Sequence, residues 1–206
     1  SSPYLSGILT SNPGMIDELM DSLLLDKLPT LVPLAKTLSE LCRGAEDIDP
    51  ILHSFKNSEH LRVGVRDILG KVDIQAAHRA LSDIAEVCLC EIARREYNRL
   101  VKRYGVPTIQ GGPLDGQVCS PVILALGKLG GREPNYHSDL DLVFVYEAPG
   151  FTQPNRPGDR HESTSNQHLF SQLAQRITKI VTRIGPFGRL YDLDSKLRPT
   201  GRSGAL

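Results

Sequence analysis

Two aspartates separated by one residue, Asp139 and Asp141, follow a glycine-rich segment that runs from Gly127 to Gly131. Side chains two residues apart in a strand point to the same face, so we expect the two carboxylates to lie side by side. Paired carboxylates suit Mg²⁺, which also takes waters and substrate phosphates as ligands. Glycines allow backbone N–H groups to approach phosphate oxygens closely. Together the two features predict a site for a nucleoside triphosphate and a metal ion.

A third acidic segment, residues 191–194, lies near the end of the sequence. Alternation along a strand from Leu190 to Leu197 would place Asp194 and Arg198 on one polar face. Asp194 would then join the first two carboxylates if the strands are neighbours. Arg198 would bind the triphosphate or form an ion pair with one of the aspartates. Asp192 shares this face, and we expect it to be solvated or ion-paired.

Three segments taken together carry a resemblance to a known family. They are Gly127-Lys128-Leu129-Gly130-Gly131-Arg132-Glu133, Ser138-Asp139-Leu140-Asp141-Leu142, and Tyr191-Asp192-Leu193-Asp194-Ser195-Lys196-Leu197-Arg198-Pro199-Thr200-Gly201-Arg202-Ser203-Gly204. In order and spacing they resemble glutamine synthetase adenylyltransferase, a member of the nucleotidyltransferase superfamily. The resemblance implies an α+β fold, with a helical region followed by a polymerase-beta-like domain that contains a small mixed sheet.

The resemblance also implies a reaction: AMP passes from ATP to a tyrosine of glutamine synthetase, and pyrophosphate is released. Asp139, Asp141 and Asp194 would be the catalytic acids and would hold Mg²⁺, and Asp194 is a candidate general base. The candidate nucleotide-binding residues are Gly127, Lys128, Gly130, Gly131, Ser138 and Arg198. For Lys128 and Ser138, a simple polar loop role remains an equal alternative. In the full-length enzyme the family implies control by a nitrogen-signalling PII-type protein.

Enzymes of this family have two similar halves, one that attaches AMP and one that removes it by phosphorolysis. Ser-Asp-Leu-Asp-Leu at 138–142 and the opening residues 2–21 resemble the attaching half. The removing half, and a nucleotide-sensing module without turnover, remain alternatives. A transferase acting on nucleic acid is disfavoured, because 24 basic and 24 acidic residues leave no net charge and the basic segments lack aromatic stacking groups.

We expect a cytoplasmic protein. We find no apolar run long enough to span a membrane and no signal-peptide pattern at the start. The four cysteines have no metal-ligand spacing, and we expect buried free thiols in a reducing compartment: Cys42, Cys88, Cys90 and Cys119. The chain of 206 residues stops directly after the last motif, so we expect it to be a piece of a longer protein.

Apolar spacing and turn residues predict the elements that must position the acids. The predicted helices are Met15–Leu25, Leu34–Cys42, Ile51–Leu69 with Leu69 facing inward, Asp73–Tyr104, and Leu169–Ile184 ending at Gly185-Pro186. The predicted strands are Pro121–Leu126, Leu140–Tyr146 and Leu190–Leu197, with a loop at 148–165. We assign residues 1–110 to a helical connecting and bracing region and residues 111–206 to the catalytic domain.

Overall fold

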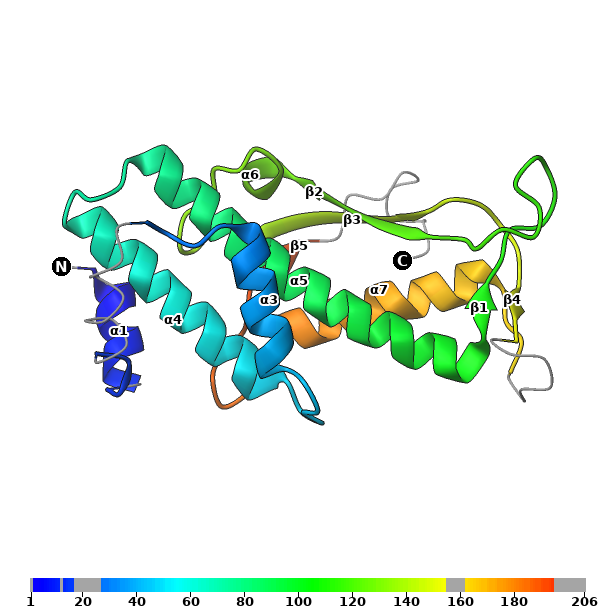
Figure 1. Cartoon of the computed structure of the whole chain (residues 1–206), viewed down its shortest axis with the longest axis horizontal. Coiled ribbons are helices and arrows are strands. Elements are labelled where there is room, and N and C mark those ends of the chain that lie inside the picture. The colour runs from blue at the N-terminus through cyan, green and yellow to red at the C-terminus, as the bar shows by residue number, and fades with distance from the viewer. Residues whose placement is uncertain (1, 12, 17–26, 155–161, 195–206) are drawn as a thin grey trace.

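The computed structural model describes residues 2–11, 13–16, 27–154 and 162–194 (Figure 1). As predicted, the fold is α+β: helices come first in the sequence and a small mixed sheet follows. The first helices are α1 (Pro3–Ser11), α3 (Leu31–Leu41), α4 (Asp49–Ile68) and α5 (Ile74–Tyr104). None of the helices in the described ranges combines the length and the apolar character that crossing a membrane requires.

Helix α5, with 31 residues, is the longest element that the structure describes, and α3, α4 and α7 (Asn166–Thr182) pack against it. The Asp73 carboxylate accepts a hydrogen bond of 2.6 Å from the Ala76 N–H and so caps the first turn. Gly105 follows the last turn with φ 85°, a conformation that favours glycine. Both ends agree with the predicted helix. Its buried apolar side chains include Ala77, Ile84 and Leu100.

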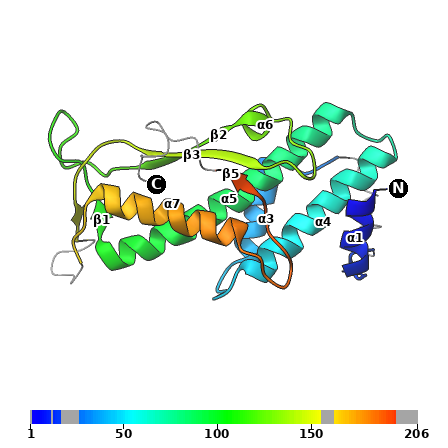
Figure 2. The ribbon, with the colours of Figure 1, turned by 180° about the vertical axis from the view of Figure 1, so that it is seen from behind.

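The sheet has three strands, with β3 in the centre. Strand β2 (Pro121–Leu126) runs antiparallel to β3 (Leu140–Tyr146), and β5 (Leu193–Asp194) runs parallel to β3. Figures 1 and 2 show α5 and α7 on the same side of the β2–β3 ribbon. One face of the sheet is therefore covered by helices, and the predicted bounds of β2 and β3 are confirmed.

One apolar core joins the helices to the sheet. The buried side chains in this cluster run from Leu34 in α3 to Leu190 ahead of β5. Helix α1 packs separately, through a small cluster in which Leu5 and Ile8 contact Leu61 of α4. The boundary near residue 110 stays a prediction, since the main core includes residues from both sides of it.

Helix α1 has no counterpart among the predicted helices. It buries only Leu5 and Ile8, which is too few to give an apolar period that the sequence reveals. The predicted helix Met15–Leu25 falls almost entirely on 17–26, outside the described residues.

Most predicted helix bounds differ from the structure by one to three residues, and other predicted segments differ as well. Leu69 is exposed because α4 ends at Ile68, and Ile184 is exposed because α7 ends at Thr182. The predicted loop 148–165 contains β4 (Thr152–Gln153), which pairs with β1 (Val106–Pro107). Strand β5 comprises two residues, and 195–197 of the predicted strand lie outside the described residues. All four cysteines are free, but Cys90 is exposed rather than buried.

The cap of α5 can be tested directly. We expect Asp73→Ala to lower the free energy of unfolding by about 1 kcal/mol, because the first-turn N–H groups lose their acceptor. Asp73→Asn, which keeps a capping oxygen, should lose less than half of that. Urea unfolding followed by circular dichroism measures both values, and equal losses would contradict the capping role.

Candidate active site

Strand pairing brings two of the three predicted acids together. Asp141 of β3 is the Cα partner of Asp194 in β5, next to the pair of Leu140 and Leu193. Adjacent strands lie about 4.8 Å apart. Leu140 and Leu142 are buried on the helix-covered side, so alternation directs Asp141 to the open face. Asp141 and Asp194 therefore stand side by side at the open face of the sheet.

The third acid, Asp139, lies just outside the sheet. The strand begins at Leu140, at its predicted bound, so the expectation that a strand carries both carboxylates on one face is wrong for Asp139. Asp139 is exposed and follows a turn in which the Asn135 N–H donates to Ser138 Oγ at 2.9 Å. The next residue is fixed: the Leu140 N–H donates to the Asp192 carbonyl at 2.9 Å. The backbone hydrogen bond of Leu140 therefore keeps Asp139 close to the pair of Asp141 and Asp194.

The donor type at this site fits Mg²⁺, although a closed cage is absent. In the described part of the chain, no three His, Cys, Asp or Glu side chains come together as a metal-binding group. Magnesium needs only one or two protein carboxylates, because waters and substrate phosphates complete its octahedral shell. Two carboxylates in register on neighbouring strands, Asp141 and Asp194, meet that requirement.

Gly127 lies directly against the carboxylate of Asp141. Leu126, the residue before it, is the cross-strand partner of Asp141. Gly127 has φ 53°, and a Cβ at this position would lie 2.2 Å from Asp141 Oδ2. A side chain here would therefore strain the backbone and displace the carboxylate at the same time. Glycine is required by the position of the acid.

The glycine-rich segment begins with a short helix. Helix α6 spans Gly127–Gly130. A Cβ on Gly130 would lie 2.5 Å from the carbonyl oxygen of Ala125, which is backbone and cannot move aside easily. A Cβ on Gly131 would lie 3.3 Å from Glu133 Oε1. The glycines allow the segment to fold tightly against β2.

The other predicted residues have different outcomes. Lys128 is exposed on α6, beside the acids. The Ser138 hydroxyl is engaged locally, because it also donates to Asn135 Oδ1 at 3.0 Å. Asp192 forms an ion pair with Arg189, as predicted. Arg198 lies outside the described residues.

Arg132 has a role that the sequence analysis missed. It has a left-handed backbone, with φ 55°. Its guanidinium donates to Asp83 at 2.7 Å and to Glu86 at 2.8 Å, both on α5. Arg132 and Glu86 also line a cavity of about 320 Å³ whose walls come from α5, α6 and the sheet. Arg132 therefore anchors the glycine-rich segment to the long helix, where apolar packing is incomplete.

Behind the acidic segments lies a group of four rings, here called the aromatic cluster: Tyr4, His60, Tyr136 and Tyr191. The Tyr4 hydroxyl and His60 Nδ1 share a hydrogen bond of 2.8 Å. Burial, with smaller contributions from the neighbouring Lys56 and His137 side chains, lowers the pKa of His60 to about 3. Burial also raises the pKa of Tyr136 to about 12 and that of Tyr191 well above its ordinary value. The cluster is therefore uncharged near neutral pH.

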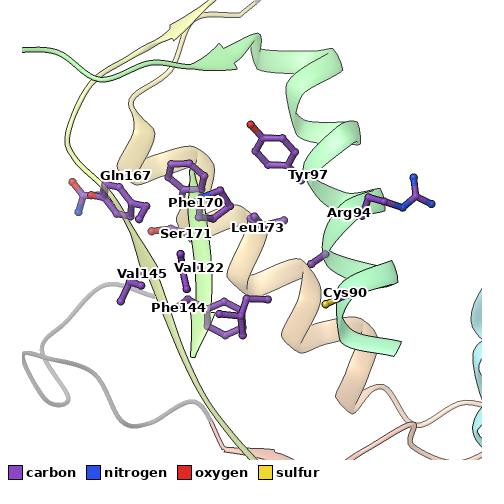
Figure 3. A pocket seen from close by; sticks show the side chains of 14 residues that line it. Cys90, Arg94, Tyr97, Val122, Phe144, Val145, Gln167, Phe170, Ser171 and Leu173 are labelled. Carbon is purple, nitrogen blue, oxygen red and sulfur yellow. The ribbon is translucent and has the colours of Figure 1, made fainter. Parts of the chain in front are cut away.

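A cavity of about 520 Å³ lies under the other end of the β2–β3 ribbon (Figure 3). Its walls include Val122 and Phe144 from the sheet, Tyr97 from α5, and Phe170 and Leu173 from α7. None of the predicted site residues lines it. We therefore place the candidate active site at the open face, around Asp141 and Gly127, and not in this cavity.

Comparison with known proteins identifies the family of the chain. A family model described as glutamate-ammonia ligase adenylyltransferase (GlnE) matches residues 1–206. The chain belongs to this family. Proteins named bifunctional glutamine synthetase adenylyltransferase/adenylyl-removing enzyme are similar to it over almost its whole length. Those from Thioalkalivibrio sulfidiphilus and Pseudomonas aeruginosa are each 33% identical and cover 100% of the chain. The one from Xanthobacter autotrophicus is 32% identical and covers 99%.

The match extends over part of these relatives only. The chain spans 21%, 21% and 20% of the three proteins, about a fifth of their length. In this member of the glutamate-ammonia ligase adenylyltransferase family, the carboxylate pair and the glycine-rich segment thus lie within a portion that its relatives share.

The contact between Gly127 and Asp141 leads to a stability prediction. Gly127→Ala should cost about 1–2 kcal/mol for the left-handed backbone and a further 1–3 kcal/mol for the collision with Asp141. Gly70→Ala is the matched control, since Gly70 has φ 64° and nothing within 4 Å of its added Cβ. Urea unfolding of both variants isolates the collision as the difference. Equal losses would show that Asp141 moves aside freely.

Burial of neutral His60 leads to a pH prediction. Its pKa is about 3 in the folded protein and about 6.5 when unfolded, so the unfolded chain takes up the proton first as the pH falls. Stability should therefore be complete above pH 6.5 and decline toward pH 3, by about 2 kcal/mol at pH 5 from this group. His60→Leu should flatten the curve in this window. His53, whose pKa burial also lowers, contributes equally to both proteins. Parallel curves would contradict the assignment.

Proposed function

We propose that this chain carries an adenylyltransferase site that moves AMP from ATP to a tyrosine hydroxyl of glutamine synthetase and releases pyrophosphate. The observation that carries the proposal is the registered pair Asp141 and Asp194 at the open face, with Gly127 packed against the first carboxylate. The names of the relatives, which speak of glutamine synthetase and of adenylyl attachment and removal, support the choice of group and protein substrate.

Asp141 and Asp194, with Asp139 from the preceding turn, would hold Mg²⁺. When bound, this ion neutralises phosphate charge and keeps the attacking and leaving oxygens in line. The exposed backbone of α6 and the Lys128 ammonium would contact the triphosphate. All of these groups lie at the same end of the β2–β3 ribbon, so one triphosphate can reach them together.

The tyrosine oxygen would form a bond to the α-phosphorus while the bond from that phosphorus to the bridging oxygen breaks. Pyrophosphate leaves with the electron pair of the broken bond. Asp194, at the strand edge next to Asp141, would accept the hydroxyl proton. The site residues therefore position the reactants and accept one proton, and no covalent enzyme intermediate is needed.

The test is the intact mass of glutamine synthetase subunits after incubation with this chain, ATP and Mg²⁺. We expect a gain of one AMP per subunit. Asp139→Asn and Asp141→Asn should each slow the transfer by roughly 10²- to 10³-fold, because charge developing at the phosphate loses its counterpart. Asp192→Asn is the matched control and should remain active, since the side chain of Asp192 pairs with Arg189.

A second arm of the same experiment offers adenylylated glutamine synthetase with inorganic phosphate. Loss of AMP in this arm, without gain in the first, would overturn the attaching reaction in favour of the removing one. ATP binding without either reaction would overturn catalysis and leave a nucleotide-sensing module. Full activity of both aspartate variants would show that the acids of this site are not involved.

A further inference from the structure

We propose that Tyr4 and His60 are positioning residues that hold the two acidic segments against each other, which makes α1 and α4 part of the catalytic unit. This inference rests on the proposed function for its kinetic consequences only. The segments concerned are the turn 135–139, which leads into β3, and residues 190–194, which lead into β5. The proposal follows from which ring of the aromatic cluster contacts which segment.

The first segment is held by Tyr4. The ring of Tyr4 lies 5.6 Å from the ring of Tyr136 and 4.8 Å from the ring of His137, edge to face in the second case. Tyr136 and His137 come three and two residues before Asp139. A ring from α1 therefore contacts the turn immediately ahead of the first acid.

The second segment is held by α4. His60 lies 6.3 Å from the ring of Tyr191, three residues before Asp194. One turn earlier on the same helix, the Lys56 ammonium donates to the Leu190 carbonyl at 2.8 Å and lies 5.0 Å from the centre of the Tyr191 ring. These contacts fix both the backbone and the side chain just ahead of β5.

His60 joins the two sets of contacts. Its ring lies 5.9 Å from Tyr136 of the first segment, and its Nδ1 bonds to the Tyr4 hydroxyl. The hydroxyls of Tyr136 and Tyr191 and the Nε2 of His60 are buried without a hydrogen-bond partner among the described residues. Ring packing, more than hydrogen bonding, therefore determines the arrangement, and removal of one ring frees its neighbours.

The direct link between the segments is the hydrogen bond from the Leu140 N–H to the Asp192 carbonyl. It lies one residue beyond Asp139 and two before Asp194, so its opening reports on their separation. The buried residues of α1, Leu5 and Ile8, pack in a cluster with Leu61 of α4, whereas Tyr4 contacts the turn ahead of Asp139. Tyr4 is thus the residue through which α1 acts on the site.

The first test is hydrogen exchange of the Leu140 amide, which needs no activity. Tyr4→Ala should raise its exchange rate by about tenfold or more, since local opening becomes easier when the ring is lost. Ile8→Ala is the matched control: it removes a buried side chain of the same helix outside the aromatic cluster. The control should leave the Leu140 rate unchanged after correction for global stability. Equal acceleration in both variants would overturn the proposal.

Tyr4→Phe separates the ring from the hydroxyl and protects the test against a variant that fails to fold. The ring remains, so Leu140 exchange should stay within about twofold of the natural protein. An increase in the Leu140 exchange rate as large as that of Tyr4→Ala would show that the hydrogen bond to His60, and not ring packing, is responsible.

The second test is kinetic. Tyr4→Ala should raise the Mg²⁺ concentration for half-maximal AMP transfer by roughly 10- to 100-fold, as for a lost residue that orients ligands, and high Mg²⁺ should restore part of the rate. Ile8→Ala should keep the natural Mg²⁺ dependence even where its melting temperature falls as far. An unchanged Mg²⁺ dependence in Tyr4→Ala would overturn the positioning role. If the natural chain transfers no AMP, the proposed function fails, and the exchange experiment still decides on the positioning of the segments.

Discussion

The candidate site depends on one backbone hydrogen bond, from the Leu140 N–H to the Asp192 carbonyl. This bond sets the register of β5 on β3 and thereby makes Asp194 the partner of Asp141. Side chains alternate along a strand, so a slip of one residue would turn Asp194 toward the helices and bring a leucine to the open face. The chemistry thus requires a register that two paired residues alone can hardly enforce. The aromatic cluster packs against the segments that lead into β3 and β5 and so helps to hold this register.

Helix α5 connects the glycine-rich segment of the site to the rest of the molecule. In its first half it binds Arg132 and with it the glycine-rich segment, and in its second half Glu96 pairs with Arg176 of α7 at 3.2 Å. Half-exposed pairs such as those of Arg132 are worth about 1 kcal/mol or less each. Glu96 is buried, so loss of its partners would leave an uncompensated charge and cost more. The ion pairs of α5 therefore stabilise the packing of α7 more strongly than they stabilise that of the glycine-rich segment.

Local signals in the sequence predicted most of the framework. Asp73 and Gly105 mark the ends of α5, and short apolar runs rich in Val, Ile and Leu mark β2 and β3, because caps and local composition depend on near neighbours. The pairing of Asp141 with Asp194 was expected only if their strands are adjacent, and adjacency is a tertiary property. Arg132 and the aromatic cluster were missed for the same reason. Tyr4 and His60 are separated by 56 residues, and no local pattern connects them.

The aromatic cluster also gives the protein its own optical reporter. The chain has no tryptophan and six tyrosines, so its near-ultraviolet signal comes mainly from phenol rings. Tyr4, Tyr136 and Tyr191, half of these rings, lie in the cluster, and burial raises the pKa of each. Their absorbance and fluorescence therefore respond to the packing immediately behind the acids. Burial also raises the pKa of Tyr97, so an alkaline spectrophotometric titration follows the cluster together with that ring, without any label introduced into the molecule.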